Sequence, residues 1–403
     1  MNEFDSLLLS PQYLSDPYSV YRNLREQAPV VWSERMDGWV ITRYRDVKNA
    51  FRDRRLNSGQ RLRSYMRQFP QQLQEDFKPL YEMYTKWLVM MDPPDHTRLR
   101  TLVNKAFTPR MVAGLAPRIE SLFDDLCESW AVTKRFELIG DLAYPLPAMM
   151  ISEMLGIPAE DRQQFHHWAD ELTAFLGSGA PQVDLAETAS QAVQQLNDYL
   201  RPIIANRRSE PRDDLISTLV KIEEQGENIS SDELLAMSVF LLVAGHETTM
   251  ALIANGVWAL LQNRCQLEQL KQDKSLLPSA VEEFLRYDSP LQHQIRVVST
   301  GFVLGGELLE PGQRVVLMLG AANRDPEQFR EPDSLVLDRF PNQHLAFGEG
   351  RHFCLGAPLA RLEAKIVFEN LLDRFPNLKA VDQTVSWRKD TSLRHPSQVW
   401  VTL

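Results

Sequence analysis

Apolar residues recur every three to four positions along most of the chain, which is the spacing of one buried face of an α-helix. This pattern predicts a helix over 18–27, a second helix opening at Asp46, and helices through most of 110–277. Pro158 and the stretch 177–181 are expected to interrupt that last region, because proline and glycine break helices. The pattern is that of a mostly helical protein.

Shorter runs rich in β-branched residues predict strands over 38–43, 294–298, 302–309, 313–319 and 398–403. Gly305-Gly306 and Pro311-Gly312 are expected to form turns between strands. A last helix is predicted over 358–374. Neither a Gly/Ser linker, a repeat nor a low-complexity stretch divides the chain, so we expect one domain, 1–403, mostly α with small β-sheets.

A long apolar helix is interrupted at its centre by the segment Ala244-Gly-His-Glu-Thr-Thr249. Glycine and polar residues in the middle of a buried helix cost stability, so they indicate a functional site or a satisfied polar network. A membrane helix is disfavoured because His246 and Glu247 break the apolar run. A zinc site of the two-histidine type is disfavoured because Met250 stands where the second histidine would be needed.

Cys354 lies in the segment Phe347-Gly-Glu-Gly-Arg-His-Phe-Cys-Leu-Gly356, just before the last predicted helix. A helix N-terminus offers a positive dipole end and unpaired backbone N–H groups, so we expect a lowered pKa and a stabilised thiolate, which is a metal ligand. Gly348, Gly350 and Gly356 allow tight turns and a close approach to a flat, bulky group. Taken alone, a single cysteine would be a small buried apolar residue.

Two pairs of charged residues have helical spacing. Glu283 and Arg286 lie three apart on one face of a predicted helix. His96 and Arg100 follow two prolines and lie four apart, and paired cationic donors suit a carboxylate ligand. Taken alone, the first pair would be a solvated surface ion pair, and the second two ordinary surface cations.

Composition excludes several classes of protein. With 44 basic and 54 acidic residues the net charge is -10, and no basic run is long enough to follow a nucleic-acid backbone. The N-terminal segment lacks the basic start and apolar stretch of a signal peptide or anchor, which predicts a cytoplasmic protein. Cys127, Cys265 and Cys354 are widely spaced, which argues against a disulfide framework and a four-cysteine metal site. No Gly-x-Gly-x-x-Gly motif marks a flavin or nicotinamide site.

These segments, in this order, resemble the cytochrome P450 superfamily, and the cysteine segment matches every fixed position of that family's haem-binding loop. The resemblance implies the cytochrome P450 fold, a single triangular-prism-like helical domain that binds haem b (iron protoporphyrin IX). Cys354 would be the axial ligand of the iron, and His96, Arg100, Arg296 and His352 would contact the haem propionates. The full set of implied cofactor-binding residues is His96, Arg100, Ala244, Arg296, Phe347, Gly348, His352, Cys354 and Gly356.

The resemblance also implies roles away from the cysteine. Gly245 would leave a groove for dioxygen, and Glu247 and Thr248 would form an acid–alcohol pair that relays the protons used in oxygen activation. Glu283, Arg286 and Arg339 would form a buried structural cluster that holds the haem loop. The substrate pocket would be lined by part of 56–90 and by Phe240, Val243, Ala244, Leu291, Gln294 and Leu393.

The family's reaction is monooxygenation, so the expected activity inserts one oxygen atom from O2 into a small organic substrate, by hydroxylation or epoxidation in secondary metabolism. Thiolate donation to the iron promotes O–O cleavage. Electrons would come from a separate ferredoxin or flavodoxin with its reductase. Oxidative coupling or desaturation would use the same iron chemistry and stays open. A haem sensor, an electron carrier or a peroxide-driven enzyme is disfavoured by the Glu247-Thr248 pair.

A redox partner would dock near the cysteine, at a candidate basic patch made of Arg98, Lys105, Arg110, Arg351, Arg361 and Lys365. Scattered solvated cations are an equally good interpretation of these residues. Arg61, Arg63 and Arg67 follow Leu56 and could meet an acidic substrate, although exposed loop arginines usually serve solubility. Glu349 adds an acid inside the cysteine segment, and the sequence assigns it no role.

Overall fold

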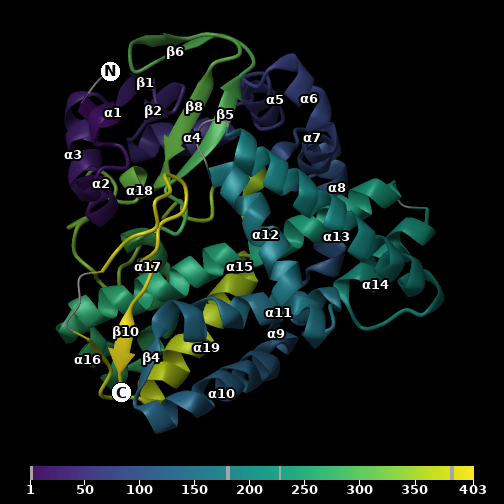
Figure 1. The fold of residues 1–403 in the computed structure, drawn as a ribbon. Coiled ribbons are helices and arrows are strands. Elements are labelled where there is room, and N and C mark those ends of the chain that lie inside the picture. The colour runs from purple at the N-terminus through teal and green to yellow at the C-terminus, as the bar shows by residue number, and fades with distance from the viewer. Residues whose placement is uncertain (1–2, 178–181, 227, 382–384) are drawn as a thin grey trace.

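The computed structural model describes residues 3–177, 182–226, 228–381 and 385–403, and helices make up most of it (Figure 1). In chain order the α-helices are α1 (Glu3–Leu7), α2 (Pro11–Ser15), α3 (Pro17–Gln27), α4 (Tyr44–Arg52), α5 (Gln60–Met66), α6 (Gln71–Asp76), α7 (Lys78–Thr85), α8 (Asp95–Ala106), α9 (Pro109–Gly114), α10 (Ala116–Thr133), α11 (Pro145–Leu155), α12 (Arg162–Gly177), α13 (Val183–Ser209), α14 (Leu215–Glu224), α15 (Ser231–Gln262), α16 (Arg264–Gln272), α17 (Leu277–Tyr287), α18 (Leu319–Ala322) and α19 (Ala357–Arg374).

The strands form one mixed sheet and two smaller units. The mixed sheet has the order β1-β2-β8-β5-β3, in which only β2 and β8 run parallel. A second sheet has the order β4-β10-β9, and β6 and β7 form a hairpin. The strand bounds are β1 (Val30–Ser33), β2 (Gly38–Ile41), β3 (Leu56–Asn57), β4 (Arg135–Glu137), β5 (His293–Val298), β6 (Phe302–Leu304), β7 (Glu307–Leu309), β8 (Arg314–Met318), β9 (Lys379–Ala380) and β10 (Trp400–Thr402).

Helix α15 crosses the middle of the molecule (Figure 1). It begins with a capping box, in which the Ser230 hydroxyl accepts from the Glu233 N–H and the Glu233 carboxylate accepts from the Ser230 N–H. By length and composition α15 could span a membrane, but 78% of its most apolar window is buried inside the protein, as in a core helix.

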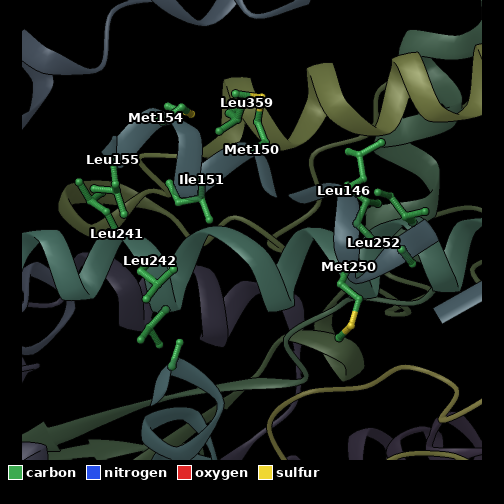
Figure 2. Close-up of a cluster of buried hydrophobic side chains, with 14 of the residues drawn as sticks. Leu146, Met150, Ile151, Met154, Leu155, Leu241, Leu242, Met250, Leu252 and Leu359 are labelled. Carbon is green, nitrogen blue, oxygen red and sulfur yellow. The ribbon is translucent and has the colours of Figure 1, made fainter. Parts of the chain in front are cut away.

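The main core lies where α11, α15 and α19 meet. Figure 2 shows Ile151 of α11, Leu242 of α15 and Leu359 of α19 in this cluster of buried side chains. The helices approach closely at Gly245, where an added Cβ would lie 2.9 Å from Ile151 Cγ1. Burial of these apolar side chains fixes α15 against its neighbours and so fixes the position of the polar segment at its centre.

The predicted mostly helical fold with small sheets is confirmed, with local differences. The second helix begins at Tyr44 instead of Asp46. The predicted turn at Gly305-Gly306 is confirmed: the two residues take positive φ angles of 61° and 93° and divide 302–309 into β6 and β7. The sequence did not predict β4 or the π-helical turn Leu138–Ala143 that follows it, because so few residues carry too little periodicity.

The predicted interruptions of the helical region can be compared in part. Helix α11 ends at Leu155 and the next helical turn begins at Ala159, so the break near Pro158 is confirmed. Helix α12 ends at Gly177, whereas 178–181 lies outside the described residues.

Candidate active site

A cavity of about 660 Å³ brings together residues that are far apart in the sequence. Its lining includes residues of α15, the segment before α19, the mixed sheet, and α8 with the chain before it. The residues predicted for haem or substrate contact that line it are His96, Arg100, Phe240, Val243, Ala244, Gly245, Glu247, Thr248, Leu291, Gln294, Arg296, Phe347, Gly348, His352, Cys354, Gly356 and Leu393.

The cysteine segment is shaped by its glycines. Cys354 N–H donates to Phe347 O at 2.9 Å, which closes the segment into a loop. Gly348 and Gly350 have φ angles of 71° and 70°, in the left-handed region that favours glycine. Gly356 has an ordinary φ of -79°, but a Cβ there would meet no atom of the described residues within 4 Å. The loop therefore leaves open space beside Gly356 on the cavity wall.

The expected lowering of the Cys354 pKa is wrong for the thiol within this chain. Burial raises its pKa, and this effect exceeds the opposing effects of the Gly356 and Ala357 N–H groups and the charge of Arg100. The Gly356 and Ala357 N–H groups do lower the pKa of Cys354, as predicted for a helix N-terminus. A bond to a metal ion deprotonates a coordinating thiol outright, so the buried thiol still suits a metal ligand.

Glu349, to which the sequence assigned no role, pairs with the end of α4. Its Oε1 lies 2.5 Å from Arg52 Nη2. Both side chains are partly exposed, so this ion pair contributes little to stability. It does connect the cysteine segment to the helix that follows β2.

Four cationic or imidazole donors gather on one part of the cavity wall: His96, Arg100, Arg296 and His352. The rings of His96 and His352 lie 4.2 Å apart between centroids, and Arg100 Nη2 donates to Phe353 O at 2.9 Å. Among the described residues, no partner accepts or donates a hydrogen bond at the buried Nε2 of His96. This donor set fits the carboxylate groups of a bound molecule.

Burial dominates the electrostatics of this wall. Burial lowers the pKa of His96 to about 4 and that of His352 to about 2, with nearby arginines adding to both shifts. Burial also lowers the pKa of Arg296 to about 10. In each case burial makes the charged form of the side chain unfavourable. An anion bound at this wall would stabilise these charged forms.

The polar segment of α15 faces the same cavity. Thr248 Oγ1 donates to Ala244 O at 3.1 Å. Glu247 is only 4% exposed, and its Oε1 accepts from Arg388 Nη1 at 3.1 Å. Its Oε2 is buried without a hydrogen-bond partner in the described part of the chain. Burial raises the pKa of Glu247, and the charge of Arg388 opposes this effect, so the carboxyl can hold a proton in the cavity wall.

The groove expected at Gly245 stays a prediction; Gly245 does line the cavity, and the packing of α11 gives a further reason for the glycine. The direction in which a side chain would leave Gly245 points at Ile151, whose Cγ1 would lie 2.9 Å from the added Cβ. The missing side chain therefore admits Ile151 of α11 beside the helix, and this close helix packing favours a glycine.

His246 is fully buried and belongs to a polar network beside Glu247 that the sequence did not reveal. Its Nδ1 is 3.0 Å from Leu242 O and its Nε2 is 3.2 Å from Asp170 Oδ1. Burial favours the neutral ring, but the hydrogen bond to Asp170 and the charge of Glu247 outweigh burial and raise the pKa of His246. Ligand-type atoms of Asp170, His246 and Glu247 lie within 4.8 Å of one another. Protein partners at both ring nitrogens of His246 explain this cluster without a metal ion.

Glu283, Arg286 and Arg339 come together outside the cavity. Arg286 donates from Nε and Nη2 to the two carboxylate oxygens of Glu283, at 2.8 Å each, and both side chains are fully buried. Arg339 Nε lies 3.0 Å from Glu283 Oε2. Arg286 also donates to the carbonyls of Asn323, Pro332 and Ser334. The cluster thus joins α17 to the irregular chain that leads to the cysteine segment.

The remaining cavity lining is largely apolar. Leu291 and Leu393 are partners in a β-bridge, so the C-terminal segment closes against the start of β5. Trp87, within the predicted stretch 56–90, also lines the cavity, as does Phe175, which the sequence had not singled out. Both side chains reach the cavity through packing between distant segments of the chain, which the local sequence periodicity does not indicate. Arg61 lines the cavity as well, whereas Arg63 and Arg67 are exposed on the outer side of α5.

Two members of the candidate basic patch already have acidic partners. Arg98 Nη2 lies 2.5 Å from Glu233 Oε1 and 3.3 Å from Asp95 Oδ1. Arg361 Nε lies 2.6 Å from Glu282 Oε1, and its guanidinium covers the Phe347 ring at 4.6 Å. Their charges are therefore partly neutralised, whereas Arg110 and Lys365 are exposed on α9 and α19.

The residues fit a haem on several independent grounds. A buried thiol, the open space beside Gly356, and donors suited to two propionates all belong to one cavity. The unpartnered Nε2 of His96 faces the same wall. A flat macrocycle with an axial thiolate and two carboxylates would satisfy each of these features.

Comparison with known proteins agrees with this geometry. The cytochrome P450 family model matches residues 18–399. Cytochrome P450 107B1 of Saccharopolyspora erythraea is 40% identical over 398 residues, which cover 97% of this chain and 96% of that protein. The vitamin D(3) 25-hydroxylase of Pseudonocardia autotrophica is 38% identical, with 98% and 96% covered.

A solved structure extends the match to three dimensions. P450BioI in complex with hexadec-9Z-enoic acid ligated acyl carrier protein has a TM-score of 0.91 at 34% identity, covering 98% of this chain and 100% of that one. Sequence and fold therefore agree over nearly the whole length. The chain belongs to the cytochrome P450 family and is a monooxygenase with haem b as its cofactor.

Proposed function

We propose that this enzyme inserts one oxygen atom from O2 into a largely apolar organic molecule, by hydroxylation or epoxidation in secondary metabolism. The observation that carries the proposal is the shared cavity: Cys354, the donors around His96, and Glu247-Thr248 all line it. The rest of the lining is mainly aromatic and aliphatic, which suits an apolar substrate. Relatives whose names mention vitamin D(3) and a hexadecenoic acyl group support elongated lipophilic molecules as the substrate class.

Cys354 and the donors of the cavity wall would hold the cofactor. The haem, held by Cys354, would supply the activation of oxygen. His96, Arg100, Arg296 and His352 would bind its propionates, and an ionised propionate beside them would offset their desolvation.

Glu247 and Thr248 would move protons at the cavity wall. Glu247 Oε2 has no hydrogen-bond partner in the described part of the chain, and burial favours its protonated form. Arg388 holds Oε1 and so restrains the carboxyl group. Thr248 Oγ1, now bonded to Ala244 O, can rotate to receive a proton and pass it into the cavity.

The test of this function is spectroscopic first and chemical second. The purified, reduced protein with carbon monoxide should show the red-shifted Soret band of thiolate-ligated haem. With a ferredoxin, its reductase and a panel of lipophilic molecules, products should gain one oxygen atom. A histidine-type band, or products that have only lost hydrogen or dimerised, would contradict oxygen insertion.

Thr248→Ala should uncouple electron use from product formation. We expect the yield of oxygenated product per electron pair to fall at least about tenfold, because a positioned proton donor contributes about 10²–10⁴-fold. The electrons and two protons should leave with O2 as hydrogen peroxide, which a peroxidase assay measures. Thr188→Ala is the matched control, since that hydroxyl makes the same bond to the carbonyl four residues earlier, on α13 and outside the cavity lining. Equal coupling in the two variants would contradict the relay.

We also propose that the enzyme works in the cytoplasm with a ferredoxin or flavodoxin that docks beside the cysteine segment. Two exposed members of the basic patch, Arg110 on α9 and Lys365 on α19, would steer an acidic partner on an otherwise acidic protein.

Charge reversal at both positions, Arg110→Glu with Lys365→Glu, should slow reduction by an acidic ferredoxin roughly tenfold at low ionic strength. The effect should shrink in high salt, because screening weakens steering. Stopped-flow measurement of the first electron transfer checks this. Lys221→Glu, on α14, is the control. A rate equal to the control at low salt would mean that these cations do not steer the partner.

A further inference from the structure

Besides Arg296 of β5, the mixed sheet supplies cavity-lining residues at the start of β8 and in the turn between β1 and β2. Arg35 and Met36, in the turn between β1 and β2, belong to the cavity lining. Arg314, the first residue of β8, lies beside Gly38 at the start of β2, where an added Cβ would be 3.0 Å from Arg314 Cβ. This part of the cavity wall is therefore formed by the sheet.

Arg314 is a buried cation that forms no ion pair with the acidic residues that the structure describes. It is 6% exposed and lines the cavity. Among the described residues, no carboxylate forms an ion pair with it and no atom accepts a hydrogen bond from its Nη1. Burial lowers the pKa of Arg314, and the charge of Asp37 offsets this effect only in part.

His293 and Arg61 lie with Arg314 on the cavity wall. His293 is 7% exposed, its Nε2 is 3.4 Å from Thr391 Oγ1, and its buried Nδ1 has no partner in the described part of the chain. Arg61 Nε donates to the thioether of Met90, a weak acceptor for a guanidinium. Burial and the charges of Arg296 and Arg314 lower the pKa of Arg61 to about 9. Arg61 is therefore within electrostatic range of both the propionate donor Arg296 and Arg314.

A buried guanidinium without a counter-charge is costly, and a ligand that carries an anion would remove this cost. A carboxylate matches the guanidinium in charge and can accept two parallel hydrogen bonds. The neutral His293 ring can donate from Nδ1 while Nε2 accepts from Thr391. Because the lining toward Cys354 is mainly apolar, the matching ligand has one carboxylate and a long apolar body.

We propose that the substrates of this enzyme are carboxylates with an apolar chain, anchored by Arg314 with His293 and Arg61, and oxidised at a carbon remote from the carboxylate. This proposal rests on the monooxygenase function proposed above. Haem propionates are carboxylates too, and the donors around His96 already suit them. Arg314 is assigned to the substrate because its strand partner is Val297, so it lies on the opposite face of the mixed sheet from the propionate donor Arg296.

The test compares three probes of equal chain length: tetradecanoate, 1-tetradecanol and methyl tetradecanoate. Dissociation constants are measured on the holoenzyme by calorimetry and by the Soret shift. Wild-type enzyme should prefer the acid. Arg314→Gln should weaken the binding of tetradecanoate about 10- to 100-fold, because a charged hydrogen-bond pair is lost. The dissociation constant of 1-tetradecanol should change less than about threefold. Arg63→Gln on the exposed side of α5 is the matched control and should change neither.

Three results would overturn the proposal. Equal weakening of acid and alcohol would mean general damage to the cavity. Unchanged affinity for the acid would mean that Arg314 does not contact it. A folded Arg314→Gln protein with a reduced haem-to-protein ratio would assign the guanidinium to the cofactor.

A second variant keeps the test decisive if Arg314→Gln does not fold. His293→Leu removes one hydrogen-bond donor and no charge. The binding of tetradecanoate should therefore weaken several-fold, whereas the binding of 1-tetradecanol should not change. The proposed monooxygenase function is tested separately, because it requires the thiolate Soret band and oxygenated products. An enzyme that shows both with neutral lipophilic molecules, yet binds the acid no better than the alcohol, contradicts only the carboxylate anchor.

Discussion

Cys354→Ser should abolish oxygenation while leaving the helical fold in place. Serine keeps the shape of the side chain but offers the iron no thiolate, which is the donor that promotes O–O cleavage. The reduced protein with carbon monoxide should lose the red-shifted Soret band, and product formation should fall below detection. Far-ultraviolet circular dichroism should stay unchanged, because the loop is also held by the Cys354 N–H bond to Phe347 O and by its glycines.

Cys265→Ser and Cys127→Ser are the controls for this experiment. Cys265 is exposed on α16 and Cys127 is buried on α10, and neither lines the cavity. Both variants should keep the thiolate band. A Cys354→Ser protein that retains the band would mean that another cysteine binds the iron, and the cavity would need a new interpretation.

The parts of the site that the sequence predicted are those carried by short, fixed spacings. Cys354 and its glycines lie within one loop, and Glu247 and Thr248 lie within one helical turn. The structure brings these segments to one cavity. The pKa of Cys354 was predicted in the wrong direction, because burial depends on the whole fold, whereas the helix N-terminus is visible locally.

The parts that the sequence did not predict depend on contacts between distant segments. Arg388 meets Glu247 across 141 positions of the chain, and Asp170 meets His246 across 76. Arg314 belongs to a correctly predicted strand, but only the pairing of β8 with β2 and β5 brings it to the cavity wall. A run rich in β-branched residues identifies a strand but does not determine which strands lie beside it.

The structural role of Glu283 depends on its burial in the fold, which the local sequence pattern does not indicate. A glutamate and an arginine three apart are usually a solvated pair on a helix surface. Here Glu283 is fully buried and accepts from Arg286, Arg339, Asn342 Nδ2 and the Val336 N–H. All of its hydrogen-bonding capacity is used, so the cost of burying its charge is offset only while every partner is present.

Glu283→Gln should therefore lower the free energy of unfolding by about 3–5 kcal/mol, because Arg286 and Arg339 would stay buried without a counter-charge. Urea denaturation of the holoenzyme followed by circular dichroism measures this loss. Since the cluster supports the chain between α17 and the cysteine segment, haem should also transfer faster to an excess of apomyoglobin.

Glu282→Gln is the matched control, at the adjacent residue and with the same chemical change. Glu282 pairs with Arg361 and His344 but is 27% exposed at its side chain, so water can replace part of what the mutation removes. The loss there should be no more than about 1 kcal/mol. Equal destabilisation by the two substitutions would show that burial of the Glu283 cluster adds nothing beyond an ordinary ion pair. A larger loss of unfolding free energy in Glu283→Gln than in Glu282→Gln, together with faster haem transfer, would show that this cluster holds the haem loop in place.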